Sequence, residues 1–141
     1  MTALRTGVDE TIDDDEELAR FLTSPRQFNS TTARPTAFLP SGGETSVFRH
    51  GAEPSGSLWQ IGRDNIVDGR TLLGAAILQV RQIRTALLDV IPVEPPPRHA
   101  VIVGWPVVAS EPDIEKAQQR QRALMLASRA TLLRLDSDAV S

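Results

Sequence analysis

The segment LLGAAILQVRQIRTALLD, residues Leu72–Asp89, carries the clearest secondary-structure pattern in this chain. Its apolar residues recur every three or four positions, and polar residues occupy most of the opposite side. The apolar series is Ala76, Val80, Ile83, Leu87 and Val90. This spacing is typical of an amphipathic helix, which buries one stripe of its surface against another layer of the fold. We therefore predict a helix over Leu72–Asp89 in the middle of the fold.

A strand is predicted soon after this helix. Ala100–Val103 is uniformly apolar and mostly β-branched, which is typical of a strand covered on both faces. Pro95–Pro97 separates the two elements, and because proline has no backbone N–H we interpret this run as a stiff connector. The alternative is that the run is a ligand for a proline-recognising domain, with Trp105 beside it.

The residues before the central helix predict one short helix and one hairpin. Acidic residues followed by an apolar stripe predict a helix over about Asp15–Thr23, because acids suit the positive end of a helix dipole. Ala37–Leu39 and Thr45–Arg49 are the predicted strands of the hairpin. Gly42 and Gly43 lie between them, where a tight turn needs residues that tolerate positive φ.

Two further helices complete the predicted elements. Ser55 or Ser57 begins one of them, and Gly69 is its predicted stop. The other begins after Ser110, where acids and a proline follow a capping residue, and it extends to Arg134. That C-terminal helix would have about 24 residues and a length of roughly 36 Å.

Together these elements predict a small two-layer α+β domain, in which a few short strands pack against the middle helix and the long C-terminal helix. The domain covers residues 13–135, with a flexible tail over 1–12 and a frayed end over 136–141. The predicted core consists of Phe38, Phe48, Trp59, Ile61, Val80, Ile83, Leu87, Val101, Val103 and Leu124.

Composition excludes several classes of function. The chain has 141 residues, no cysteine and two histidines, so we expect no disulfide, no metal centre and no cofactor. Its net charge is −3, and the acidity lies within residues 1–40, so the chain lacks the basic field of a stand-alone nucleic-acid-binding protein. No apolar run approaches 18 residues and Met1–Asp9 has no signal-peptide core, so we expect a cytoplasmic protein without membrane contact.

Charged side chains supply two candidate binding sites. The acidic run Asp13, Asp14, Asp15, Glu16 and Glu17 can dock on a basic partner protein, although helix capping also accounts for most of these acids. Arginines on the two long predicted helices can contact phosphates within a larger nucleoprotein complex, although solvated helix faces also carry such residues. These nucleic-acid candidates are Arg81, Arg84, Arg120 and Arg122.

The triplet Arg49-His50-Gly51 after a predicted strand resembles the nucleophile motif of the histidine phosphatase superfamily. The resemblance implies that His50 accepts a phosphoryl group and that Arg49 holds the phosphate. The chain departs from the family pattern because only about 90 residues follow His50, with one clear strand among them. In that family the motif ends the first strand of a large parallel sheet.

Two longer runs carry a second resemblance. TSVFR at Thr45–Arg49 and PPPRHAVIVGWP at Pro95–Pro106 resemble a group of small uncharacterised bacterial proteins, over roughly Leu18–Leu126. Fourteen arginines against one lysine are also typical of a GC-rich bacterial genome. The resemblance implies a bacterial origin and no particular activity.

The leading hypothesis is a non-catalytic bacterial accessory protein that binds a partner protein, within a defence, toxin–antitoxin or phage-related system. Its basis is the absence of phosphate-binding glycine loops and nucleophile elbows, together with the acidic N-terminal run. The alternatives are a nucleic-acid-contacting subunit and a phosphatase that uses His50. The C-terminal helix can also pair with its copy in a dimer, although Gln121 and Ser128 interrupt the apolar rhythm of a regular coiled coil.

Overall fold

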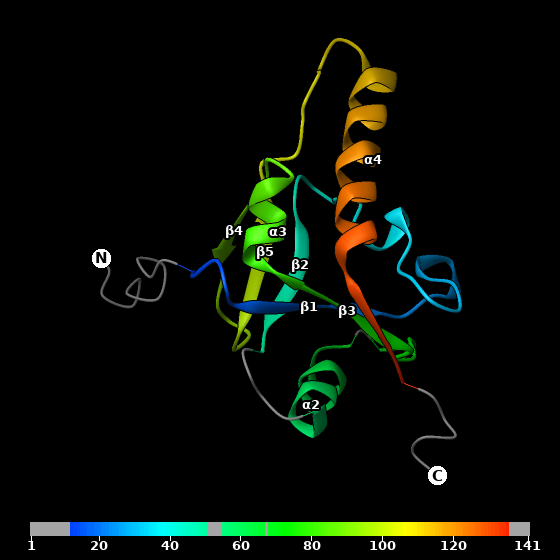
Figure 1. The fold of residues 1–141 in the computed structure, drawn as a ribbon, viewed down its shortest axis with the longest axis vertical. Helices are drawn as coiled ribbons and strands as arrows, with labels where there is room; N and C mark the ends of the chain where they lie inside the picture. Colours follow the sequence, from blue (N-terminus) through cyan, green and yellow to red (C-terminus); the bar gives the residue numbers. More distant parts are fainter. Residues whose placement is uncertain (1–11, 51–54, 67, 136–141) are drawn as a thin grey trace.

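The computed structural model describes residues 12–50, 55–66 and 68–135, which form one six-stranded sheet with helices on both faces (Figure 1). In chain order the elements are β1 (Glu17–Leu22), the 3-10 turns η2 (Pro25–Gln27) and η3 (Pro35–Ala37), β2 (Thr45–Arg49), α2 (Ser55–Asn65), β3 (Gly74–Gln79), α3 (Val80–Thr85), β4 (Asp89–Pro92), β5 (His99–Val103), α4 (Pro112–Arg129) and β6 (Thr131–Arg134). This is the predicted α+β class, with the predicted long helix near the C-terminus.

The sheet has the strand order β4-β5-β2-β1-β3-β6, and its neighbouring strands are antiparallel. Central strand β1 pairs with β3 along its full length, from Glu17 opposite Gln79 to Leu22 opposite Gly74. On its other side β1 pairs with β2 only at two positions, where Leu18 and Ala19 face Arg49 and Phe48. The β1–β2 ladder therefore ends early, and a gap follows between the two strands.

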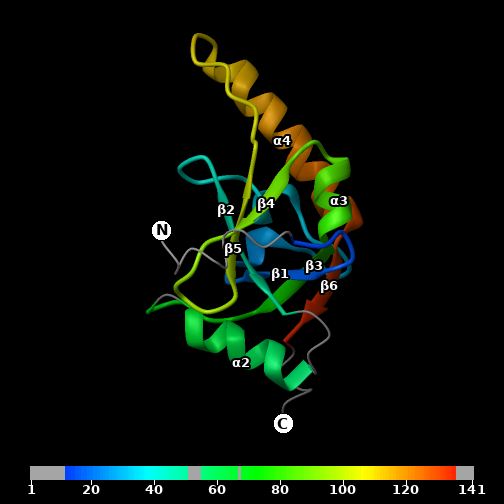
Figure 2. The same ribbon diagram turned by 90° about the vertical axis from the view of Figure 1, so that its left-hand side faces the viewer.

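The helices lie on opposite faces of the sheet, with α3 and α4 on one side and α2 on the other (Figures 1 and 2). The α4 side holds the main core, which includes Leu18, Leu22, Phe38, Ile83, Ile102 and Leu126. The α2 side holds a smaller cluster in which Leu58 packs with Ala19 and Ala75. Burial on both faces explains why β3 is apolar at every position from Ala75 to Leu78.

Three predicted elements are confirmed near their expected bounds. Strands β2 and β5 cover the runs that predicted them, and α2 begins at Ser55 but ends at Asn65, before the predicted stop at Gly69. In the turn before β2, Gly42 and Gly43 have φ values of 63° and 85°. Those angles are the left-handed conformation that the two glycines were expected to supply.

The predicted helix over Leu72–Asp89 is wrong for most of its length. Its first half is strand β3, a single short helix α3 follows, and its end is the start of β4. The run from Ala75 to Leu78 is apolar at every position, which suits a strand that lies between two others and is covered on both faces. Leu87, placed in the core by helical spacing, is 72% exposed.

The predicted helix over Asp15–Thr23 is also wrong, because these residues form β1. Leu18 and Leu22 enter the main core, whereas Ala19 and Phe21 belong to the cluster under α2. A nine-residue helix is marginal in isolation, and full pairing with β3 satisfies the backbone instead. Ile12, expected in the flexible tail, is 2% exposed and belongs to the main core.

Two other boundaries differ from their predictions. Ala37–Leu39 is not a strand, because Ala37 ends the turn η3; Phe38 nevertheless lies in the core as expected. The C-terminal helix ends at Arg129, and Thr131–Arg134 then forms edge strand β6 beside β3. Leu124 was a predicted core residue but is 55% exposed.

The remaining predictions for the chain ends, over 1–11 and 136–141, lie outside the described residues. Pro95–Pro97 lies in the connection between antiparallel strands β4 and β5, as a connector would. Within the described part of the chain, none of the helices combines the length and hydrophobicity needed to span a lipid bilayer.

Candidate functional site

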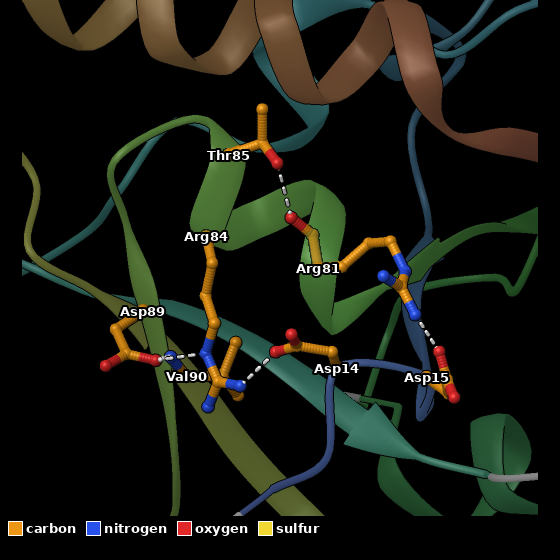
Figure 3. Close-up of polar contacts among 7 residues, drawn as sticks. All are labelled: Asp14, Asp15, Arg81, Arg84, Thr85, Asp89 and Val90. Carbon is orange, nitrogen blue, oxygen red and sulfur yellow. Dashed lines mark hydrogen bonds and ion pairs between the residues drawn. The ribbon is translucent and has the colours of Figure 1, made fainter.

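The acidic N-terminal run and two of the nucleic-acid candidates lie against each other (Figure 3). Arg84 of α3 forms ion pairs with Asp14 and with Asp89, the latter at 3.1 Å. These hydrogen bonds, that to Asp14 first, raise the pKa of Arg84 above its ordinary value. Arg81 forms an ion pair with Asp15. Two oppositely charged candidate sites thus neutralise each other, which reduces the field that either offers to a partner.

The other end of the acidic run pairs with the predicted phosphatase residues. Arg49 binds Glu16 with two hydrogen bonds, from Nε to Oε2 at 2.5 Å and from Nη2 to Oε1 at 3.0 Å. His50 is buried, and its Nε2 lies 3.4 Å from Oε1 of Glu17. A phosphohistidine enzyme needs an accessible imidazole and an arginine aimed at phosphate, and this arrangement supplies neither.

The two arginines of α4 differ in their surroundings. Arg122 donates from Nη1 to the backbone carbonyl oxygens of Ala86 at 3.2 Å and Leu87 at 3.4 Å, which ties α4 to the end of α3. Arg120 is exposed and makes no hydrogen bond or ion pair within the described residues. Of the four nucleic-acid candidates, three therefore have contacts that account for them structurally.

Replacing Arg84 with glutamine should lower the free energy of unfolding by about 0.5–1 kcal/mol, because partly exposed ion pairs contribute little. The loss should shrink in high salt, which screens such pairs. Urea denaturation at low and high ionic strength measures both effects, with the exposed Arg63→Gln as the matched control. A salt-independent loss would show that Arg84 acts through packing instead.

A cationic side chain that was not a sequence candidate fills the gap between β1 and β2. Arg20 donates from Nε to the carbonyl oxygen of Ala37 at 2.7 Å and from Nη1 to that of Ser46 at 2.9 Å. These bonds replace part of the missing ladder. Burial lowers the pKa of Arg20, and no carboxylate contacts its guanidinium within the described residues. A partly buried cation held only by backbone oxygens is uncommon, because buried charges are normally paired.

A pocket of about 410 Å³ opens beside this guanidinium. Arg20, Phe21 and Phe48 line it together with Arg70, whose Nη1 lies 3.4 Å from Oγ1 of Thr23. The two phenylalanine rings lie 5.8 Å apart between centroids, tilted by 48°. The pocket thus combines two guanidinium groups with an aromatic wall.

Ser46 also lines the pocket and belongs to a hydrogen-bonded chain of three groups. Its Oγ lies 2.6 Å from Nε2 of His99, and Nδ1 of His99 lies 2.8 Å from the carbonyl oxygen of Val93. A carbonyl only accepts, so Nδ1 carries the proton, and in the neutral ring Nε2 then accepts from the serine hydroxyl. The Ser46 oxygen consequently keeps its lone pairs for other groups.

A different surface is formed by the first half of α4, which projects beyond the sheet together with segment 104–111 (Figures 1 and 2). Gln119 donates to the carbonyl oxygen of Pro106 at 2.9 Å, and Glu115 accepts from the backbone of Val108 at 2.9 Å. These bonds tie the segment to one side of α4. The opposite side exposes a stripe at heptad-like spacing, defined here as the α4 stripe: Ile114, Ala117, Gln121 and Leu124.

No protein-family model, curated protein or solved structure matches the chain in comparisons. Within residues 12–50, 55–66 and 68–135, no group of three or more acidic or histidine side chains is arranged to hold a metal ion. The features that bear on function are therefore the pocket, the charge pairs and the α4 stripe.

Proposed function

We propose that the chain is a non-catalytic accessory protein that binds a partner protein through the α4 stripe. One observation carries the proposal. Leu124 is 55% exposed and Ile114 is 41% exposed, on a helix that projects from the body of the domain (Figure 2). An apolar stripe on a projecting element is typical of an interaction surface. The buried residues of α4 begin at Ala123, because the first half of the helix projects beyond the sheet (Figure 2).

The charged residues of α4 indicate which charges a partner surface should carry. Glu111 and Asp113 lie at the N-terminal end of α4, whereas Arg120 and Arg129 lie nearer its C-terminal end. A complementary surface therefore carries basic groups at one end of an apolar groove and acidic groups at the other. Such complementarity sets the orientation of the bound helix and excludes mismatched partners.

We infer that the partner is a different protein rather than a second copy of this chain. A stable interface buries roughly 1,200–2,000 Å² in total. The stripe spans about 15 Å of helix and holds two large apolar side chains, so self-pairing falls short of that area. A partner with its own apolar groove surrounds the stripe and so adds buried area. The nucleic-acid alternative has less support, because Arg81, Arg84 and Arg122 already have protein partners.

Leu124→Glu should abolish the association without unfolding the domain, because a charge placed in an apolar contact lowers affinity by about a hundredfold. Full-length wild-type protein is isolated gently from its native cells beside Leu124→Glu and the matched control Gln118→Glu, which lies on the same helix outside the stripe. We expect one partner protein to co-purify in a fixed ratio with the wild type and with the control. No partner should co-purify with Leu124→Glu.

Two outcomes would overturn this proposal. One is a partner that remains bound to both variants, which would place the interface elsewhere. The other is a light-scattering mass that shows a dimer of this chain broken by Leu124→Glu, which would make the stripe a self-association surface. Circular dichroism of both variants confirms that the fold is intact.

A further inference from the structure

The pocket between β1 and β2 has no role in partner binding through α4, and it has the features of a separate ligand site. The pocket lies where the backbone pairing of β1 with β2 stops, after Ala19 and Phe48. Arg20 occupies the gap and is one of the residues that line the pocket. Two of its five N–H groups bind backbone carbonyls, so donors remain for a further acceptor.

We propose that this pocket binds a small molecule that carries a ring and one anionic group, either a carboxylate or a phosphate. Arg20 and Arg70 bind the anion, since guanidinium groups match the paired oxygens of both groups. A bound anion also supplies the counter-charge that Arg20 lacks within the described residues.

The apolar wall defines the rest of the ligand. Phe21 and Phe48 form a tilted pair of rings in the pocket lining, and Ile66 adds an aliphatic side chain. A ring packed on this wall gains aromatic contact in addition to apolar burial. A volume of about 410 Å³ lies at the lower end of the range for small-molecule sites, so the ligand is compact.

Ser46 supplies a polar contact for the same ligand. When the His99 ring is neutral, the hydroxyl hydrogen of Ser46 is directed to its Nε2, so the serine oxygen presents lone pairs and accepts a hydrogen bond from a hydroxyl or amino group of the ligand. The ligand class is therefore a ring-bearing monocarboxylate or monophosphate with at least one donor group. The assignment requires binding and no chemical step.

Binding is tested by NMR titration of the full chain with 4-hydroxybenzoate, 4-hydroxyphenyl phosphate and, as a neutral analogue, 4-hydroxybenzyl alcohol. We expect shifts at Phe21, Ser46 and Phe48 with the two anions, and binding of 4-hydroxybenzyl alcohol that is weaker by about tenfold or more. The tighter of the two anions distinguishes a carboxylate site from a phosphate site.

Arg70→Glu tests the charge without disturbing the core, because Arg70 is exposed. It should weaken binding of both anions by about tenfold or more, whereas the matched control Arg63→Glu, on exposed α2 surface outside the pocket, should leave it unchanged. The proposal is overturned if neither anion binds the wild type at about 10 mM, or if the two variants bind equally. Because Leu124→Glu leaves the pocket intact, its effect on partner binding is independent of this result.

Discussion

Replacing Phe38 with alanine should lower the free energy of unfolding by about 3–5 kcal/mol, the largest loss expected from a single truncation in this chain. Phe38 is 0% exposed and is one of the largest fully buried side chains. Its backbone is fixed on both sides, because its N–H donates to Pro35 at 2.9 Å and its carbonyl accepts from Oγ1 of Thr45 at 2.8 Å. The surrounding core cannot easily collapse into the cavity, so the full cost is expected.

The matched control is Leu87→Ala. Helical spacing places Leu87 in the core, whereas the structure leaves it 72% exposed. Truncation of an exposed side chain usually changes stability by less than about 0.5 kcal/mol. Chemical denaturation of both variants therefore compares the sequence-based core with the structural one. Similar losses for the two would mean that α3 and β4 pack differently from the arrangement described here.

The strands that could be predicted are those whose own residues determine them. Ala100–Val103 is short, β-branched and bounded by prolines and glycine, so a helix is excluded locally and a buried strand remains. Thr45–Arg49 alternates between core and pocket side chains and follows a two-glycine turn. In both cases local preference and tertiary position agree.

The strands that could not be predicted depend on partners distant in the chain. Ala75–Leu78 fits a helix or a buried strand equally by composition, and its choice is made by pairing with β1 on one side and β6 on the other. At Gly74 an added Cβ would come within 2.6 Å of the carbonyl oxygen of Leu133, so close approach of β6 requires glycine there. A single sequence does not display that approach.

The candidate pocket was not predicted for the same reason. Ser46 and His99 are 53 positions apart, and Arg20 lies on a segment expected to be helical. The pocket depends on two strands that stop pairing, which is a property of three-dimensional register and leaves no local pattern. The available signal was weak: a lone arginine among apolar residues in the run from Leu18 to Leu22.

The charged candidates differ from the pocket, because they are conspicuous in the sequence but pair with each other in the fold. Asp13–Glu17 and the arginines of α3 each stand out in the sequence as a cluster of one sign. The fold brings Asp14 and Asp15 against Arg84 and Arg81, so most of each cluster's charge is compensated internally. Clusters of opposite sign within one small domain are better interpreted first as potential partners for each other.

Arg20→Met should lower the free energy of unfolding by about 2–4 kcal/mol, the second large effect expected here. Methionine keeps most of the length of the side chain but donates no hydrogen bond, so the carbonyls of Ala37 and Ser46 lose their donors at the gap between β1 and β2. Each unsatisfied carbonyl costs about 1–3 kcal/mol, and relief of the desolvated charge offsets part of the sum. Urea denaturation measures the total. Hydrogen exchange should show the loss of protection beginning at β1 and β2, because the arginine joins these strands where their ladder ends.

Arg20→Lys distinguishes hydrogen bonding from charge. A lysine ammonium reaches one of the two carbonyls but lacks the planar fork that binds both, so an intermediate stability is expected. If charge burial dominated, methionine would be more stable than lysine, and the wild type would be no more stable than either. That order would mean that Arg20 is retained against the stability of the domain, and its guanidinium would then be explained by the anion it binds. The opposite order makes Arg20 a structural bridge whose remaining donors are available to a ligand.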